Sequence, residues 1–288
     1  MSLADHLFPL DRPETRGECL HARIVEGFAA LSAVVFAFRW AEYLQGVSSL
    51  PFPTGVARWL PLDWVLAPGV AFGAVGLLAL LVGLGWARVT RWAYPAAIVV
   101  LHLMYAARHS LGKTSHGSHL VGLTLLAFAI AVVSFRDESV RRRVGVGMAL
   151  FFVGLSYLWA AVSKLVASGG MWSDGRHLVL WIAEKQVDLL SRTGADGLNV
   201  LQEMVLAAPW VGTVLLTIGV VSEACGPLLW WRQTRVWAAL LLIGMHIGIL
   251  LTMNIFFYTY IVHLAILALP WSSLFDLMLA RRAAPPGL

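Results

Sequence analysis

Long stretches without a charged residue divide this chain, and each is about as long as a membrane-spanning helix. The charge-free stretches are residues 64–87, 114–135, 144–163, 204–222 and 236–275. A helix that crosses the hydrocarbon core needs about 20 residues, so the last stretch is long enough for two spans with a turn near residues 254–260. Two weaker stretches, 24–43 and 92–107, bring the predicted number of spans to eight.

The composition agrees with a membrane environment. Apolar residues make up 59% of the chain and charged residues only 13%, whereas soluble domains carry about 25% charged residues. No long repeat or low-complexity linker divides the sequence. We therefore predict an all-α protein, a polytopic membrane helix bundle that forms a single domain over residues 1–288.

The distribution of lysine and arginine predicts the orientation, because these residues favour cytoplasmic loops. Placing the N-terminus in the cytoplasm assigns most of them to that side: Arg12, Arg16, Arg23, Arg88, Arg91, Arg136, Arg141, Arg142, Arg143, Arg232, Arg235, Arg281 and Arg282. The opposite side receives Arg58, Arg108, Lys113, Arg176, Lys185 and Arg192. We expect a protein of the inner (cytoplasmic) membrane with both termini in the cytoplasm, residues 1–22 forming a cytoplasmic N-terminal segment. The net charge of +5 suits anionic membrane lipid, and nucleic acid binding is not expected.

The longest predicted segment outside the membrane is an extracytoplasmic connection at residues 168–208, between spans five and six. Its apolar residues recur at helical spacing: Leu178, Leu180, Trp181, Val187, Leu189 and Leu190. This pattern predicts an amphipathic helix on the membrane surface. Such a helix either covers a cavity or only links the two spans.

Lys164 stands directly after the charge-free stretch 144–163. An ammonium group at the margin of a membrane span is costly to desolvate, so its side chain either extends to water or is held as a reactive amine. Tyr157 lies two helical turns earlier and shares a face with Lys164. The position of this amine decides whether the protein is an enzyme.

Further polar residues are predicted on the outer side. His102, Tyr105 and His109 share one face of the third span, and a donor-rich turn with His116 and His119 follows it. Arg39 and Glu42 end the first span, and Asn254 ends the seventh. All of these residues lie at one depth if the predicted topology holds.

One acidic residue is predicted away from this group. Glu223 falls in the inner half of the sixth span, beside Gly226. A carboxylate buried there is costly unless it is neutral or paired, and we expect Arg232 or Arg235 as its partner.

The histidines have simpler interpretations as well. His102, His246 and His263 fit satisfied interior positions between helices. Haem ligation by His102 and His246 is not expected, because the pattern lacks paired histidines at matching depth on two helices. His116 and His119 lack a nearby set of cysteines or carboxylates, so no metal site is expected.

Residues 157–165, followed by Gly170, Trp172 and Gly175, resemble a segment of the horizontally transferred transmembrane (HTTM) family, which includes the vitamin K-dependent gamma-glutamyl carboxylases. Residues 23–27 at the start of the first span add to the resemblance. So do residues 223–229 and 234–235, which lead to His246.

The resemblance implies that Lys164 is the base that deprotonates a reduced lipid quinone, with His116 or His119 assisting. Oxygen then attacks the quinone ring, and the resulting strong base drives a carboxylation with CO2 or a related oxidation. The candidate cofactor-binding residues are Tyr157, His102, Tyr105, Trp172, Arg39, His246 and Asn254. The expected partners are membrane lipid, the quinone, and a secreted peptide or small protein as acceptor.

Two other function classes stay open. A non-catalytic membrane helper in the maturation, export or immunity of a secreted peptide needs no reactive amine. A transporter or a haem protein is a further alternative. The large extramembrane part that binds the substrate protein in the carboxylases has no counterpart in these residues, so we expect a different acceptor.

Overall fold

The computed structural model describes residues 2–50, 52–60, 62–112, 116–194 and 197–283. Within these ranges all regular elements are helices, and no strand occurs. The predicted all-α class is therefore confirmed.

Four described helices are long and apolar enough to cross a membrane. They are α2 (Arg16–Leu44), α3 (Pro68–Trp86), α6 (Glu138–Ser168, continued by the 3-10 helix η4, Gly169–Ser173) and α10 (Arg235–Met253). The number rises to six if two bent helix pairs each form one span: α8 (Val200–Ala207) with α9 (Pro209–Ala224), and α11 (Tyr258–Ala268) with α12 (Trp271–Ala283). These lengths and compositions indicate a multi-pass membrane protein.

The chain divides into two compact units, and each is described by itself. The first unit contains residues 1–152 and 270–288, and the second contains residues 153–269. Helix α6 runs across the division and contributes its first half to one unit and its second half to the other.

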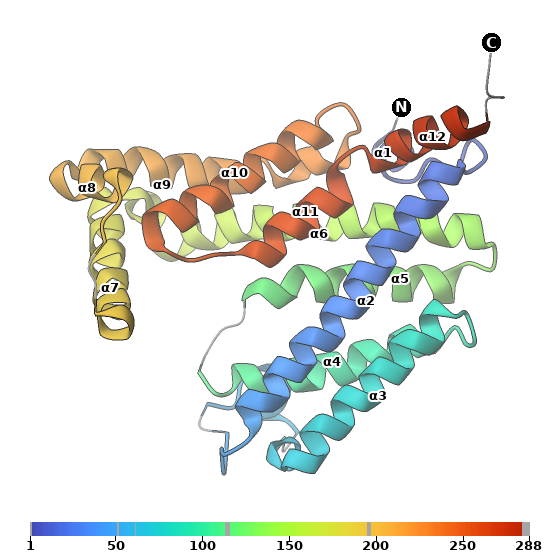
Figure 1. Ribbon diagram of the computed structural model, residues 1–288, viewed down its shortest axis with the longest axis horizontal. Helices are drawn as coiled ribbons and strands as arrows, with labels where there is room; N and C mark the ends of the chain where they lie inside the picture. The colour runs from blue at the N-terminus through green and yellow to red at the C-terminus, as the bar shows by residue number, and fades with distance from the viewer. Residues whose placement is uncertain (1, 51, 61, 113–115, 195–196, 284–288) are drawn as a thin grey trace. The chain divides into compact units, whose positions relative to one another are not determined.

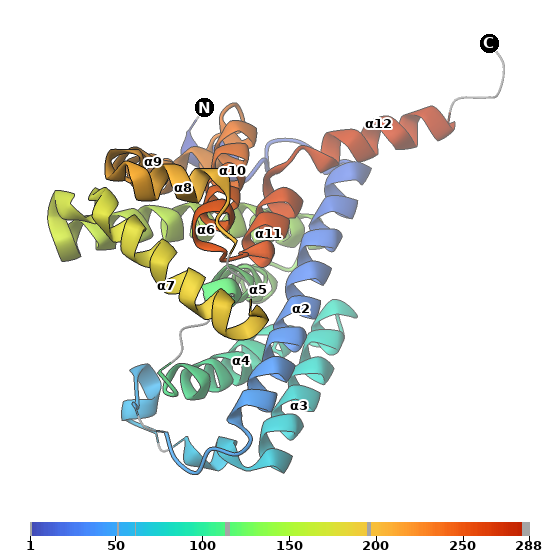
Figure 2. The ribbon, with the colours of Figure 1, turned by 60° about the vertical axis from the view of Figure 1, so that its left-hand side comes forward.

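In the first unit, α2 packs against α3, α4 (Ala93–His109) and α5 (His119–Ser134) (Figures 1 and 2). The buried face of α2 is made of alanines four residues apart: Ala29, Ala33, Ala37 and Ala41. Because small side chains let helix backbones approach closely, this alanine row explains how one helix contacts three others.

A buried carboxylate joins three helices of the first unit. Glu26 of α2 is 0% exposed. It accepts hydrogen bonds from Arg88 at 2.5 and 2.8 Å and from the Tyr94 hydroxyl at 2.5 Å. Arg88 adopts a left-handed backbone conformation, with φ of 59°, in the turn after α3. The network compensates the charge of Glu26, a charged residue within the weakly predicted first span, residues 24–43.

The chain before α2 is tied to α6. Arg143 donates to the carbonyl oxygens of Pro9 and Arg12 at 2.5 and 2.6 Å, and Arg142 forms an ion pair of 2.6 Å with Glu14. Helix α2 begins at Arg16, eight residues before the predicted start, since Thr15 and Glu18 form a capping box. A short helix, α1 (Leu3–Leu7), precedes it.

The second unit contains the second half of α6, then η4, α7 (Gly175–Thr193), α8, α9, the 3-10 helix η5 (Gly226–Trp230), α10 and α11. Helix α7 runs in a different direction from α9 (Figure 1). It buries Leu178 and Ile182 against Val205 of α8. Helices α8 and α9 meet at an angle of 115°, directly before Pro209. The charge-free stretch 204–222 is thus a bent pair and not one straight span.

Helix α7 begins with a charged cap. The Asp174 side chain accepts a hydrogen bond from the Arg176 backbone N–H at 2.9 Å and pairs with the Arg176 side chain. These bonds, with the Arg176 side chain contributing most, lower the pKa of Asp174 to about 2. The cap therefore stays ionised at every physiological pH.

Candidate functional site

Lys164 is held in an ion pair with Glu223. The amine donates to both carboxylate oxygens, each at 2.5 Å. The Lys164 side chain is 26% exposed and the Glu223 side chain 10%. The lysine therefore neither extends into open water nor stands alone, and its charge is balanced inside the second unit.

This pairing corrects the predicted environment of Glu223. The sequence placed it in the inner half of a span, far from Lys164, with Arg232 or Arg235 as its partner. Because the chain bends before Pro209, α9 is short, and its C-terminal end lies beside the C-terminal end of α6. Arg235 instead donates to the backbone carbonyl of Leu229 at 3.0 Å.

Trp172 of η4 lies next to the amine. The Lys164 nitrogen is 5.4 Å from the centroid of its ring. An ammonium over an indole face is attracted by the ring quadrupole. The amine thus has a carboxylate and an aromatic face as neighbours, and Trp172 is one of the residues that the sequence proposed for this site.

A second polar pair lies in the same unit. The Tyr157 hydroxyl and His246 Nε2 are 2.7 Å apart, and both residues are buried. Nδ1 of His246 is buried too and has no hydrogen-bond partner among the residues that the structure describes. Because Tyr157 and Lys164 are two turns apart on α6, the two pairs are neighbours along one helix face.

The segment that follows Glu223 packs closely on α6. A Cβ on Gly226 of η5 would lie 2.7 Å from the Cβ of Tyr157. Glycine at this position lets η5 lie directly on α6.

Aromatic residues from the start of α11 surround His246. The ring centroids of Tyr260 and Phe257 are 4.9 and 5.5 Å from that of His246. Asn254, another predicted site residue, is exposed and ends α10 in a left-handed conformation, with φ of 53°. The structure therefore gives Asn254 a capping position.

The other predicted site residues belong to the first unit. Tyr105 is hydrogen-bonded to His119 Nε2 at 2.6 Å. His102 stacks on Tyr105 with centroids 6.4 Å apart, and His109 meets it edge-on at 5.7 Å. The predicted shared face of α4 is confirmed. Arg39 is exposed near the end of α2, and the side chain of His116 lies outside the described part of the structure.

Four of the predicted site residues, Lys164, Tyr157, Trp172 and His246, lie in the second unit. The sequence did not predict Glu223 as their neighbour. The available signal was the cost of burying that carboxylate, which required a partner but did not identify one.

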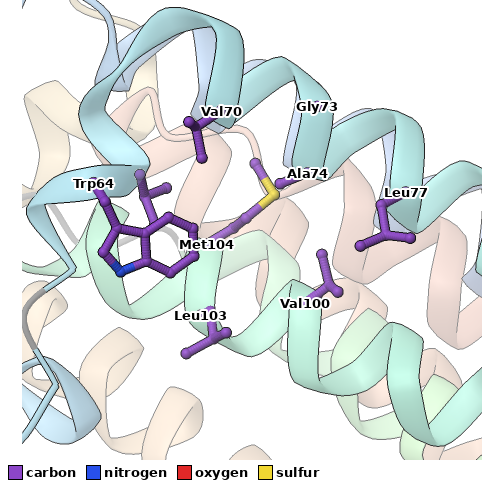
Figure 3. Close-up of a pocket in the computed structure, with 9 residues that line it drawn as sticks. Trp64, Val70, Gly73, Ala74, Leu77, Val100, Leu103 and Met104 are labelled. Atoms are coloured by element: carbon purple, nitrogen blue, oxygen red, sulfur yellow. The ribbon is translucent and has the colours of Figure 1, made fainter.

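An apolar cavity of about 430 Å³ lies in the first unit, between α3 and α4 (Figure 3). Trp64, Leu77, Val100 and Met104 are among its lining residues, and none of the lining residues is charged. Its walls suit an alkyl or isoprenoid chain. No cluster of three or more histidine, cysteine or acidic residues placed to hold a metal ion occurs in the described ranges.

The fold and these polar pairs define a multi-pass helical membrane protein with an ion pair and a tyrosine–histidine pair in one unit. No family model matches the chain, and neither a curated protein nor a solved structure matches it.

Proposed function

We propose that this protein is a membrane-embedded enzyme that uses the Lys164–Glu223 pair to take a proton from a hydroxyl group of a reduced lipid quinone. The observation that carries the proposal is the bidentate contact between the amine and the carboxylate, with both side chains largely buried. The resemblance to the HTTM family and its vitamin K-dependent carboxylases supports the same role for Lys164.

Proton transfer within the pair makes the lysine a base. In a medium of low dielectric, charged groups lose hydration, and a neutral amine beside a carboxylic acid competes with the ionised pair. Once Glu223 holds the proton, Lys164 Nζ accepts one from the bound hydroxyl. The amine is then an ammonium, Glu223 is neutral, and the single positive charge faces the anion that the hydroxyl leaves.

The charge-free residues beside this pair support a position within the membrane. Residues 144–163 precede Lys164 in α6, and residues 209–222 precede Glu223 in α9, without a charged residue in either stretch. The two stretches approach the pair from opposite directions, because Gly175, beyond Lys164, lies against Pro209 at the start of α9. We therefore propose that the pair lies within the apolar layer.

The aromatic and polar residues of this unit support the proposed quinone by their chemistry. Trp172, Phe257 and Tyr260 offer aromatic faces, and Nδ1 of His246 is a buried polar atom without a partner among the described residues. Tyr157 and His246 would orient the ring oxygens. When bound, the quinone supplies the reducing equivalents for the reaction with O2 that powers carboxylation by CO2 or a related oxidation.

The proposed placement keeps eight spans in the inner (cytoplasmic) membrane, with both termini in the cytoplasm and the site toward the outer face. Helix α7 lies on the outer surface in this arrangement. Its exposed apolar residues, Leu180, Val187 and Leu190, are spaced for one helix face that enters the lipid boundary. A secreted peptide or small protein is the proposed acceptor.

A non-catalytic helper of secreted peptides is the second candidate. The observation in its favour is that Glu223 occupies both hydrogen bonds of a bidentate contact with the amine. A pair that is satisfied in this way stabilises a helix bundle without any ligand.

Turnover separates the two candidates. The protein is reconstituted with menaquinol and supplied with oxygen, and quinol oxidation is followed by absorbance. We expect K164M to lose at least 100-fold in rate. The matched control is K185M, because Lys185 is a second ion-paired lysine of the same unit, with a similar exposed fraction of 28%. K185M should stay within about twofold of the wild type.

Wild-type protein that neither oxidises menaquinol nor retains a quinone after gentle detergent extraction would refute the enzyme. Wild-type rates in a folded K164M protein would refute the role of the lysine.

A further inference from the structure

Arg108, in the last turn of α4, is a buried cation with no anionic partner in the part of the chain that the structure describes. The residue is only 5% exposed, and its guanidinium carbon lies 4.4 Å from the centroid of the Tyr43 ring. Its Nε is buried and has no hydrogen-bond acceptor within the described ranges. No described carboxylate lies within ion-pair distance of Arg108, and a cation–π contact alone rarely offsets the desolvation of a guanidinium.

The other arginines held inside the first unit are paired. Arg88 binds Glu26, Arg142 binds Glu14, and Arg143 donates to two backbone carbonyls. Each of these arginines therefore has an acceptor for at least part of its guanidinium. Arg108 departs from this pattern, so an acceptor from outside the chain is the natural complement.

The position of Arg108 identifies the kind of acceptor. Leu44 at the end of α2, Leu66 just before α3, and Ala107 next to Arg108 pack into one cluster. Since α2 and α3 are candidate membrane spans, their shared end marks a membrane boundary, where lipid phosphates lie.

Two residues near Arg108, Ser110 and Tyr43, differ in exposure, because Ser110 is buried and Tyr43 is exposed. Ser110 holds the loop before η1 (Gly55–Arg58), accepting from Phe52 N–H at 3.0 Å through its carbonyl and from Thr54 N–H at 3.2 Å through its hydroxyl. Tyr43, which stacks on the guanidinium, is 54% exposed.

We infer that Arg108 binds the phosphate group of an anionic phospholipid at this boundary, with Tyr43 stacked on the guanidinium. The planar guanidinium has two parallel N–H groups that match two phosphate oxygens. The inference concerns the first unit and does not rest on the proposed function, which concerns residues of the second.

Lipid retention tests the inference on the full-length protein. Delipidated protein is mixed with dioleoylphosphatidylglycerol, with dioleoylglycerol, which has the same tails but no phosphate, or with inorganic phosphate. Native mass spectrometry measures the bound lipid, and thermal unfolding measures stabilisation. We expect retention and a raised Tm with the phospholipid and neither effect with dioleoylglycerol. An equal rise in Tm with millimolar inorganic phosphate would identify free phosphate as a source of the same group.

The variant R108Q should lose at least fivefold in retained phospholipid. The control R58Q removes an exposed arginine of η1 in the same unit and should stay within twofold of the wild type. Equal retention in folded R108Q and wild type would overturn the inference. So would wild-type protein that gains no stability from either phosphatidylglycerol or phosphate, a result that does not depend on whether R108Q folds.

Discussion

Lys164 and Glu223 should stabilise the fold mainly through each other, which means that the coupling free energy between the two side chains is large. Removing one partner of a buried pair costs about 3–5 kcal/mol, because the remaining charge stays buried without compensation. Glu223 is the more buried partner, with a side chain 10% exposed against 26% for Lys164. We therefore expect K164M, which strands the carboxylate, to cost about 3 kcal/mol. E223L, which strands a lysine that water partly reaches, should cost about 2 kcal/mol.

The double variant K164M/E223L decides whether these losses come from the pair. Apolar side chains of similar volume often replace a buried ion pair at little cost, so the double variant should unfold close to the wild type. The resulting coupling free energy is about 3–5 kcal/mol. Denaturant unfolding in detergent, followed by tryptophan fluorescence, measures it.

The pair of Lys185 and Glu184 is the matched control for this cycle. Its N–O distance is 3.0 Å, and the Glu184 side chain is 65% exposed. An exposed pair contributes about 0–1 kcal/mol, so its cycle should show little coupling. A coupling below about 1 kcal/mol at Lys164 and Glu223 would show that water, and not the partner, compensates each charge.

Three further outcomes follow from the geometry. E26Q should destabilise the protein by about 3 kcal/mol in denaturant unfolding, because Arg88 loses its buried anion; wild-type stability would contradict the network. G226A should cost about 1–3 kcal/mol, because its Cβ would lie 2.5 Å from a backbone carbonyl of α6, whereas G219A, with open space around it, should be neutral or slightly stabilising. The pKa of Asp174 is lowered from 3.8 to about 2, so its ionised form stabilises the fold above pH 3.8, and this contribution is lost as the pH falls toward 2. The Tm difference between wild type and D174A should therefore shrink over that range, and a constant difference would exclude the linkage.

The sequence predicted the helical class and most helix positions because burial in lipid leaves a direct signal, a long run without charge. It did not predict the bend at Pro209. Proline suits the first position of a helix and bends or ends a helix when it lies inside, so Pro209 was a signal for a break that the charge-free stretch alone does not show. The charge-free stretch looks the same in a straight helix and in a bent pair.

The site was predictable to the extent that helix periodicity governs it. Tyr157 and Lys164 share a face because both lie on α6, seven residues apart. Glu223 reaches Lys164 through the bend before α9, a tertiary feature that no local pattern encodes. The start of α2 was predicted eight residues late, because the apolar run begins after the capping box of Thr15 and Glu18 that starts the helix.

Three buried or partly buried charges of this protein are compensated in three different ways. Glu26 is compensated by a network, Lys164 by one bidentate carboxylate, and Arg108 by the face of Tyr43. Arg88 keeps Glu26 as a carboxylate partner, whereas Arg108 has no carboxylate partner among the described residues. Because each unmet hydrogen bond of a charged group costs more than a neutral one, affinity for an external anion should be greatest at Arg108. Proton exchange, by contrast, needs a partner that can take the proton, and Lys164 has one in Glu223.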